Sequence, residues 1–513
     1  MRSSITICFF FIVYSLQAQI TAVPDSTFHA TGYLEIDQSE TGHAIAMQSD
    51  FKIVVAGDDG NCRLVRLHPD GSIDSTFGTN GAVVWDRFGD DFTLAEMVIQ
   101  DDGKIVVAGY TEWEEVFIVR FTQSGDMDTS FNGGYQWIWS DDYEYHYTYD
   151  VNLQPDGKIV TAGLLSTGGF GGSYADLFLI RLMPDGTFDN SFAGDGKLYM
   201  GNSTYDRVIA RCIDVQPDGK LLVGGYHLNN SDKEYLRVWR LDSNGAIDTT
   251  FNETGTITLS INGKPCRVMD IAYTDYGKIL CAGYAYKDTI LFPFLLQLNP
   301  DGSMDNTFGT NGIWYTEHTT NMYFRKLAIK DERIYITGTI DSVQANNQLL
   351  LMCFNKYGEP DESFGAHGLM KATGSYKDHV GYDIIVQPDD RIAVCGSVSG
   401  GMGNPRMFAM RFLHQEIIDP QTIPDQTTLV NMYPNPVGTN TLNLQFDLAK
   451  ADVLHIELYD MYGNRCAILL PSSAYDIGKY QFSVSLPPGL GSGQYVVRCI
   501  ASEFSSSISL IVL

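Results

Sequence analysis

Short apolar stretches separated by turns recur along most of the chain and predict β-strands. One stretch is continuous, rich in β-branched residues and closed by glycine, as in "IVVAG" and "ILCAG". Because both faces of such a run are apolar, it predicts a strand that is covered on both sides. A later stretch, such as "FIVRF", alternates apolar and polar positions and predicts a neighbouring strand. The first stretch occurs seven times, beginning at Ile53, Ile105, Ile159, Leu221, Ile279, Ile334 and Ile392.

Turn signals group these strands into repeated units. A Pro-Asp-Gly turn precedes the continuous strand in units such as those at residues 155–157 and 217–219, since proline presets φ and glycine accepts positive φ. Turn aspartates such as Asp70, Asp156 and Asp218 are interpreted as structural, because such carboxylates accept hydrogen bonds from nearby backbone N–H groups. A further turn, running from aspartate to phenylalanine, precedes each fourth strand. It also occurs seven times, beginning at Asp25, Asp74, Asp128, Asp189, Asp248, Asp305 and Asp361.

Four short strands per unit, with a period of about 58 residues, predict an all-β fold: a seven-bladed β-propeller over residues 21–413. A single sheet cannot bury both faces, whereas a ring of sheets buries them against one another. The chain begins with an unpaired turn, "PDSTF", and the repeats stop after a third strand, "MFAMRF". The N-terminal segment is therefore expected to supply the missing fourth strand and close the ring, which removes two sheet edges. An open solenoid is the alternative, but neither end resembles a capping unit.

Two residue types in the units have expected packing roles. The glycine that closes the continuous strand is expected to let neighbouring blades approach closely. The phenylalanine after each aspartate turn is expected to act as a wedge between blades. The repeated motifs themselves, Q-P-D-G-K-I-x-x-A-G and R-L-x-P-D-G-x-x-D-x-x-F-G-x-x-G, resemble the delta-60 repeat, a propeller-type repeat of secreted bacterial proteins. The resemblance covers roughly residues 24–412, and it implies no reaction and no catalytic residues.

The C-terminal part of the chain has a different pattern. Residues 414–429 are polar, contain two prolines and predict a linker. Residues 430–513 contain alternating strands such as "LNLQFDL" and "LHIELYD" and predict a small β-sandwich. The phrases "YPNP", "LYDMYGNR", "LGSGQYVV" and "ISLIVL" resemble, in order and spacing, the type A C-terminal sorting domain of type IX secretion substrates. The resemblance implies that the sorting signal includes Tyr433, Pro434, Asn435, Pro436, Asp460, Gly463, Gly493 and Tyr495.

The N-terminus and the charge extend this picture. Residues 1–18 combine one arginine, an apolar run and a small residue at Ala18, which predicts a secretory signal peptide. No later stretch has the length of apolar residues that a transmembrane helix needs. The net charge of −28 argues against nucleic-acid binding, which needs a positive surface. Together with the sorting-domain resemblance, these features imply a monomer handled by the type IX secretion machinery and released from, or displayed on, the outer membrane of a Gram-negative bacterium.

Catalytic motifs are not found in the sequence. The cysteines occur singly, without C-x-x-C, and Cys281 and Cys395 replace aliphatic residues of the continuous strand, which predicts buried small hydrophobic side chains rather than a metal site. There is no H-E-x-x-H, no phosphate-binding loop and no G-x-S-x-G. No metal and no cofactor are therefore expected.

Aromatic residues near acids, at the crossings between units, are the candidate binding site. Rings beside carboxylates suit sugar stacking or a cation, although inter-blade packing would explain the same aromatics. The favoured function is a non-enzymatic binding or scaffold propeller for a surface glycan or a protein. The alternative is a propeller hydrolase or lyase acting on polysaccharide. The candidate ligand-binding residues are Trp85, Trp137, Trp139, Asp141, Asp142 and Trp314.

Overall fold

The computed structural model divides the chain into two compact units, Met1–Gln415 and Glu416–Leu513, which are described separately. The structure describes residues 23–36, 41–86, 91–113, 115–138, 144–167, 174–201, 207–229, 231, 233–341, 347–365, 368–372, 377–400, 404–414, 428–433, 437, 441–448, 451–460, 465–488, 490, 493–501 and 505–512. Within these residues the elements are β-strands and one short 3₁₀ turn, η1 (Asn132–Gly134). No helix in the same ranges is long and apolar enough to cross a membrane.

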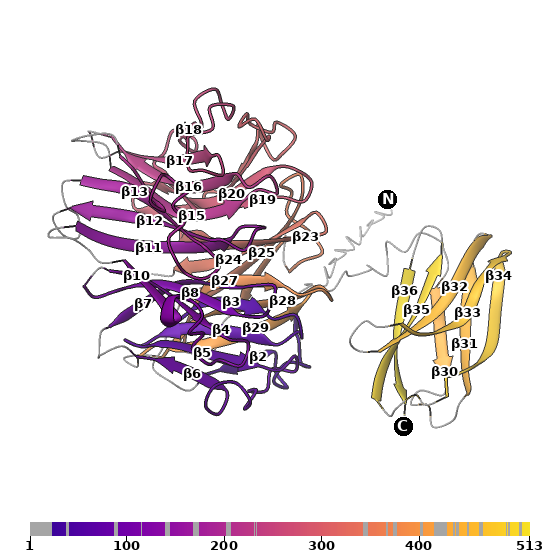
Figure 1. Cartoon of the computed structure of the whole chain (residues 1–513). Helices are drawn as coiled ribbons and strands as arrows, with labels where there is room; N and C mark the ends of the chain where they lie inside the picture. The colour runs from indigo at the N-terminus through magenta and orange to yellow at the C-terminus, as the bar shows by residue number, and fades with distance from the viewer. Residues whose placement is uncertain are drawn as a thin grey trace, which may run out of the picture. The chain divides into compact units, whose positions relative to one another are not determined.

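The first unit consists of antiparallel sheets, and in all of them but the last the strands follow one another in the sequence (Figure 1). Within the described residues of this unit, six sheets have four strands. They are β3–β6 (Thr41–Met47, Ile53–Asp58, Cys62–Leu67, Ala82–Trp85), β7–β10 (Phe92–Ile99, Ile105–Thr111, Val116–Phe121, Tyr135–Ile138), β11–β14 (Glu144–Leu153, Ile159–Thr167, Tyr174–Leu182, Lys197–Met200), β15–β18 (Arg207–Val215, Leu221–Leu228, Glu234–Leu241, Thr256–Leu259), β19–β22 (Cys266–Tyr273, Ile279–Lys287, Ile290–Leu298, Ile313–Tyr315) and β23–β26 (Asn321–Lys330, Arg333–Asp341, Gln348–Asn355, Leu369–Ala372). Repeated four-stranded sheets of this kind are the architecture of a β-propeller.

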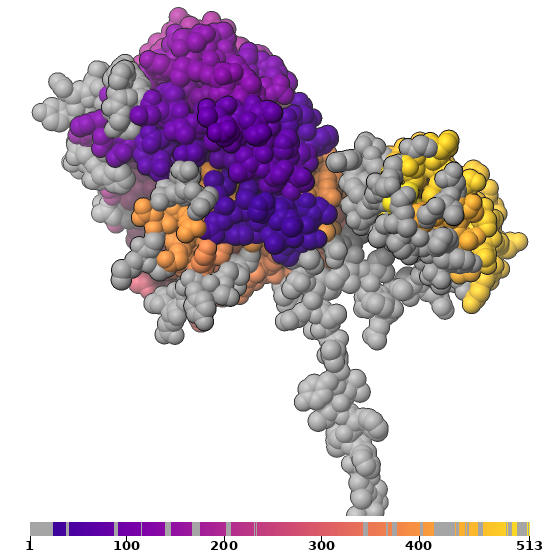
Figure 2. Space-filling view, turned by 90° about the horizontal axis from the view of Figure 1, so that it is seen from below, coloured from indigo at the N-terminus to yellow at the C-terminus, as the bar shows by residue number. Residues whose placement is uncertain are grey.

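The N-terminal segment completes the last sheet of this unit. Strands β27 (Asp378–Val386), β28 (Arg391–Ser399) and β29 (Arg406–Leu413) form three of its strands. The short strands β1 (Val23–Pro24) and β2 (Tyr33–Glu35) pair with β29, Val23 opposite Leu413 and Leu34 opposite Ala409. The indigo N-terminal sheet therefore lies beside the orange last sheet in both views (Figures 1 and 2). The pairing that the register of the repeats predicts is present.

Burial explains why the second strand of each unit is continuously apolar. Ile105, Val106, Val107 and Ala108 of β8 are all 0% exposed, because side chains of both faces pack into apolar clusters that join successive sheets. Cys281 and Cys395 occupy aliphatic positions in the same kind of strand and are fully buried, as predicted.

The glycine predicted to close this strand lies inside it, since β12 continues from Gly163 to Thr167, and its role differs from the predicted one. A Cβ at Gly163 would lie 2.0 Å from the carbonyl oxygen of Tyr147, which belongs to β11 of the same sheet. Next to this contact β11 contains a β-bulge between Thr148 and Asp150, which pushes its backbone toward β12. The expectation of close approach between neighbouring sheets is therefore wrong at this position. The glycine accommodates the bulge of its own partner strand.

The phenylalanine after each aspartate turn does act as a wedge. Phe131, which follows β9, is fully buried against Gly186, a turn glycine of the next sheet, where a Cβ would lie 2.9 Å from its ring. Phe28 of the N-terminal segment packs in the same way on Gly71 of the first sheet. The wedge thus recurs where the last sheet meets the first.

An arginine on the third strand joins the wedge, the aspartate turn and the next sheet. Arg181 donates from Nε to Asp189 Oδ2 (2.8 Å) and from a terminal nitrogen to the carbonyl oxygen of Ser243 in the following sheet. Its guanidinium lies 4.6 Å above the ring centroid of Phe192, a cation–π contact. We call this arrangement the arginine latch. It occurs at Arg66, Arg120, Arg181, Arg240 and Arg411.

The second unit contains two sheets with one apolar core. The three-stranded sheet consists of β30 (Thr428–Tyr433), β31 (Thr441–Leu448) and β34 (Gly478–Ser485). The four-stranded sheet consists of β32 (Asp452–Asp460), β33 (Arg465–Tyr475), β35 (Gly493–Ala501) and β36 (Ser505–Val512). Alternate residues of both sheets, such as Leu444, Ile456 and Val497, are fully buried in a single cluster. The alternation predicted for this region corresponds to these inward-facing side chains.

Candidate functional site: the central pocket

The first strands of the sheets carry a β-bulge at one equivalent place. In each strand the register shifts by one residue, which turns the following side chain inward and strengthens the local twist. In β7 the shift lies between Leu94 and Glu96, and in β23 it lies between Phe324 and Lys326. The residues that directly follow the bulges are Ala44, Glu96, Asp150, Cys212, Asp270, Lys326 and Asp383.

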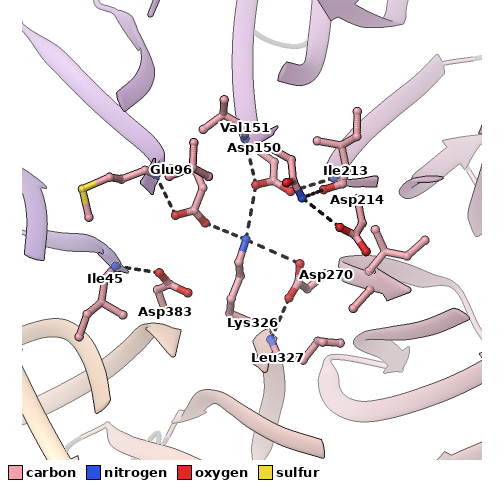
Figure 3. A pocket seen from close by; sticks show the side chains of 15 residues that line it. Ile45, Glu96, Asp150, Val151, Ile213, Asp214, Asp270, Lys326, Leu327 and Asp383 are labelled. Carbon is pink, nitrogen blue, oxygen red and sulfur yellow. Dashed lines mark hydrogen bonds and ion pairs between the residues drawn. The ribbon is translucent and has the colours of Figure 1, made fainter. Parts of the chain in front are cut away.

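These first strands converge on a polar pocket with a volume of about 260 Å³ (Figure 3). We call it the central pocket, since its lining includes residues of β3, β7, β11, β15, β19, β23 and β27. Apolar side chains such as Ile45, Val151 and Ile213 surround the charged groups. Its ionisable side chains are Glu96, Asp150, Asp214, Asp270, Lys326 and Asp383.

Lys326 is the cation at the middle of the pocket. Its Nζ atom lies 2.7 Å from Glu96 Oε2, 3.4 Å from Asp150 Oδ1 and 3.7 Å from Asp270 Oδ1. The lysine comes from β23, whereas the three acids come from β7, β11 and β19, so one side chain ties four sheets together. Figure 3 shows the ammonium group between the carboxylates, with dashed lines to each of them.

Backbone N–H groups hold the aspartates in place. Asp150 Oδ2 accepts a bond from Ile213 N, Asp270 Oδ2 accepts one from Leu327 N and Asp383 Oδ2 accepts one from Ile45 N, all at 2.8 Å. In each case the donor lies on the first strand of the next sheet. The bond from Ile45 to Asp383 spans 338 residues and joins the first and last sheets.

Asp214 extends this set at the neighbouring position of β15. It accepts a bond from Tyr273 N (2.6 Å) and another from the side-chain amide of Asn152 (3.0 Å). The carboxylates of the pocket are thus connectors between sheets as well as lining groups.

Burial changes the proton affinity of these groups. It raises the pKa of Asp150 to about 7, and the pKa values of Asp214 and Asp270 to about 6, although Lys326 or backbone N–H groups act in the opposite direction. Burial also raises the pKa of Asp383 well above its usual range. Burial by itself would lower the pKa of Lys326, but the carboxylates of Asp150, Asp270 and Glu96 outweigh it and raise that pKa. The pocket therefore keeps a charged lysine and an excess of acids, some of which are protonated near neutral pH.

The structure places the predicted tryptophans in packing positions. Trp85 and Trp137 are 7% exposed and belong to one apolar cluster, in which the ring of Trp85 lies 4.9 Å from that of Phe92. The indole N–H of Trp137 donates to Glu115 (2.8 Å). Trp314 is half-buried against Phe354, with ring centroids 4.7 Å apart. These contacts favour the packing interpretation for the three indoles. Trp139, Asp141 and Asp142 lie outside the described residues, so ligand binding by this set stays a prediction.

The residues of the predicted sorting signal lie at strand ends of the second unit where the structure describes them. Tyr433 ends β30, Asp460 ends β32 and Gly493 begins β35. Tyr495, also in β35, packs partly buried against the apolar core of the unit. Residues 434–436 and 463 lie outside the described ranges.

The sequence analysis missed Lys326 and the acids around it. A signal was present, because these residues stand four positions before the residue that opens the turn after each first strand, for example Glu96 before Gln100 and Asp150 before Gln154. When the units are aligned, this position of the first strand is occupied mostly by charged residues, although the strand around it is otherwise apolar. Charged residues in such a strand are costly to bury unless they have partners.

A family model supports the repeat architecture. Segments 48–77, 100–131, 154–192, 216–251 and 277–308 match the model described as "Domain of unknown function (DUF5122) beta-propeller". The chain is a β-propeller repeat protein. Each matched segment ends in an Asp-to-Phe turn, so the model covers the wedge and most of the latch.

Several solved structures are similar to this propeller protein, all at low sequence identity. The polysaccharide lyase Uly1 superposes with a TM-score of 0.43 at 11% identity, covering 73% of this chain and 90% of its own. Sqt1 from Chaetomium thermophilum superposes with a TM-score of 0.40 at 10% identity, covering 77% of this chain and 98% of its own. A protein of unknown function from Bacteroides caccae superposes with a TM-score of 0.36 at 13% identity, covering 64% of this chain and 94% of its own. Similarities of this size do not assign a function. None of the curated protein sequences matches the chain.

Proposed function

We propose that the chain is an extracellular binding protein built on a seven-bladed, delta-60-type propeller that the N-terminal strands close. The ligand, a surface glycan or a protein, binds at the central pocket. The supporting observation is that Asp150, Asp270 and Asp383 each bond to the backbone of the next sheet, and that Asp150 and Asp270 also pair with Lys326 in the same pocket. Such a pocket is preorganised and polar, which suits hydrogen bonding to a ligand. Its acids are fixed by structural bonds rather than left available to transfer protons.

A polysaccharide hydrolase or lyase is the second candidate. It is favoured by the pKa of about 7 at Asp150, since a general acid works best with a pKa near the ambient pH. However, Asp150 Oδ1 accepts a bond from Val151 N (3.0 Å) and Oδ2 accepts one from Ile213 N. Because both oxygens already accept backbone bonds, binding without turnover is the better supported function.

The binding proposal is tested with the chain from residue 19 onward on a glycan array and in pull-downs from cell surfaces. Asp214→Asn removes one pocket charge while an amide oxygen remains to accept bonds. It is expected to weaken binding about tenfold, as the loss of one charge-assisted contact does. Asp218→Asn is the matched control, because Asp218 lies in an exposed turn two residues after Gln216, and its variant should bind like the unchanged protein.

Two results would count against this assignment. Equal binding by both variants would place the ligand elsewhere, and Trp139→Ala then tests the crossing predicted from the sequence. Release of shortened sugars from a bound glycan, lost in Asp150→Asn, would establish the hydrolase or lyase instead.

The export route is part of the same proposal. Residues 1–18 direct the chain across the inner membrane, and the second unit, a β-sandwich, is the type A sorting domain that the type IX machinery recognises at the outer membrane. In a Gram-negative host with this machinery, deletion of residues 430–513 should leave the propeller in the periplasm, measured by immunoblots of periplasm, cell surface and medium. Surface display of the truncated chain would contradict the sorting assignment. An Ile468→Ala variant, changed at a 54% exposed side chain outside the predicted sorting signal, should be exported normally.

A further inference from the structure

Two sheets of the propeller lack the latch arginine, and different side chains contact the turn aspartate in each of them. Gln297 replaces it in β21 and Cys353 replaces it in β25. In the sheet of Gln297, Lys278 Nζ approaches the turn aspartate Asp305 to 2.8 Å and supplies the positive charge. In the sheet of Cys353 the turn aspartate is Asp361. Its neighbours include a thiol, Cys353, and an imidazole, His414.

A histidine occupies the space that the arginine leaves. In the latched sheets the guanidinium reaches a carbonyl oxygen in the next sheet, three residues beyond that sheet's own latch position, for example Ser243 after Arg240. The equivalent residue for Cys353 is His414, three residues after Arg411. The His414 side chain is 1% exposed, and its Nε2 lies 3.6 Å from Asp361 Oδ2. Cys353 Sγ lies 3.9 Å from the same oxygen.

The charge at this position differs from that of the latched sheets. There the turn aspartate pairs with the latch arginine and with a second-strand cation, as Asp189 does with Arg181 (2.8 Å) and Lys158 (3.4 Å). At Asp361 the second-strand cation is Arg333 (3.7 Å), and neutral Cys353 stands where the arginine would be. The cluster has therefore lost one positive charge and gained a sulfur and an imidazole nitrogen.

We propose that Cys353 Sγ, Asp361 Oδ2 and His414 Nε2 bind a divalent transition-metal ion of the zinc class, which replaces the cation of the latch. Sulfur, nitrogen and carboxylate oxygen form the donor set that zinc takes in proteins. The three atoms lie within 4.8 Å of one another. A tetrahedral ion needs roughly 3.2–3.8 Å between such donors. Small rotations of the three side chains would bring their donor atoms to these distances. The thiol releases its proton to water when the metal binds.

Two further contacts suit a metal site. His414 Nδ1 lies 2.8 Å from the hydroxyl of Tyr335, a hydrogen bond that fixes the ring with Nε2 toward Cys353 and Asp361. Asp361 Oδ1 accepts bonds from the backbone and hydroxyl of Ser363 (3.0 and 2.6 Å), which leaves Oδ2 for the ion. The Asp361 side chain is 19% exposed, so its carboxylate contacts solvent.

This site escaped the sequence analysis because its ligands are far apart in the chain. Cys353 and Asp361 flank the turn after β25, and His414 follows β29 of the next sheet. The prediction of no metal rested on the absence of closely spaced ligand pairs. Only the replacement of the latch arginine, visible once the sheets are aligned in space, brings the three side chains together.

The test uses the metal-free chain from residue 19 onward, titrated with Co²⁺ and then with Zn²⁺. Binding is expected at one ion per chain, with the thiolate-to-cobalt charge-transfer band that only a sulfur ligand produces, and Zn²⁺ should abolish the band. Cys353→Ser and His414→Gln should each weaken binding by about 100-fold or more. Cys281→Ser is the matched control, since Cys281 is also fully buried but lies in another sheet and outside the cluster. It should keep the band.

A restored latch keeps the test decisive if the single variants fold poorly. The double variant Cys353→Arg with His414→Ser recreates the residue pair of Arg181 and Ser243. It should fold without metal, melt at least as high as the metal-free original chain and show no charge-transfer band. The proposal is overturned if the unchanged chain gives no such band at stoichiometric Co²⁺. It is also overturned if the double variant binds Co²⁺ as tightly as the unchanged chain, since the ion would then be held by other acids.

Discussion

Replacement of Arg411 by alanine is expected to lower the free energy of unfolding of the first unit by about 3 kcal/mol. Arg411 and its partner Asp25 are 3% and 1% exposed, and the Nε–Oδ2 distance is 2.7 Å. The guanidinium also donates to the carbonyl oxygen of Pro69 and lies 4.9 Å above the ring of Phe28. Without it, a buried carboxylate loses its main partner. Arg391, 3.0 Å from Asp25, remains and limits the loss.

This latch differs from the other four because it holds the N-terminal segment. Asp25 and Phe28 precede the first sheet, whereas Arg411 lies in β29 of the last sheet. Its loss should therefore also free residues 23–36 from β29. Urea denaturation measures the first effect, and limited proteolysis followed by mass spectrometry of the N-terminal peptide measures the second.

The matched control for Arg411 lies on the same strand. Arg406 pairs with Glu35 of the same N-terminal segment at 2.5 Å, but its side chain is 47% exposed. Surface pairs of this kind contribute about 0–1 kcal/mol, so Arg406→Ala should change the unfolding free energy and the proteolysis little. Equal effects of the two substitutions would contradict the importance assigned to the buried latch.

Replacement of Lys326 by methionine is expected to cost about 3–5 kcal/mol of stability at pH 7. Glu96, Asp150 and Asp270 would lose the cation that lies 2.7, 3.4 and 3.7 Å from them. Methionine keeps the length and the apolar stem of the side chain, so the loss reports charge rather than packing. Thermal and urea unfolding of the full chain measure it.

The pH dependence of this variant identifies the cause. Burial places the folded pKa of Asp150 at about 7, above the ordinary value of 3.8 that it has in the unfolded chain. Between these values the folded state binds more protons than the unfolded state, so stability falls as pH rises from about 4 to about 7. Lys326 lowers the pKa values of Asp150 and Asp270, so its loss raises the folded values further. The defect of Lys326→Met should therefore be largest at pH 7 and shrink toward pH 5.

A lysine in a surface pair is the control for Lys326. Lys287 pairs with Glu317 at 2.5 Å, and its side chain is 50% exposed. Lys287→Met should give no measurable change at pH 5 or pH 7. If Lys326→Met lost the same stability at both pH values, the carboxylates around the lysine would not be its energetic partners.

Local sequence patterns predicted the repeated strands and turns well. The continuous apolar strand, the two turn types and the alternating strand each depend on residues close in sequence, and the structure contains them in the predicted order. The unpaired Asp-to-Phe turn at Asp25 also predicted that the N-terminal segment pairs with the last sheet, because the last repeat unit ends after its third strand. The wedge role of residues such as Phe131 followed from the same register.

Predictions that required knowing a side chain's neighbours succeeded less well. The tryptophans at the crossings are aromatic and close to acids in the sequence, yet Trp85 and Trp137 are buried among other rings. Gly163 has no space for a Cβ because a bulge in the neighbouring strand of its own sheet brings that backbone close. No local sequence pattern reveals this bulge. Four of the five latch arginines stand eight residues before their aspartates, a constant spacing that was available in the sequence but was not interpreted.

The sequence by itself thus determined the all-β repeat architecture and the order of its strands, because turns and strand periodicity are set by residues a few positions apart. Only the tertiary structure decided which charged and metal-binding side chains meet. Lys326 and Asp150 are 176 residues apart in the chain, and Ile45 and Asp383 are 338 apart. The strength of such contacts depends on distance and burial, which arise only when the first strands converge and exclude water.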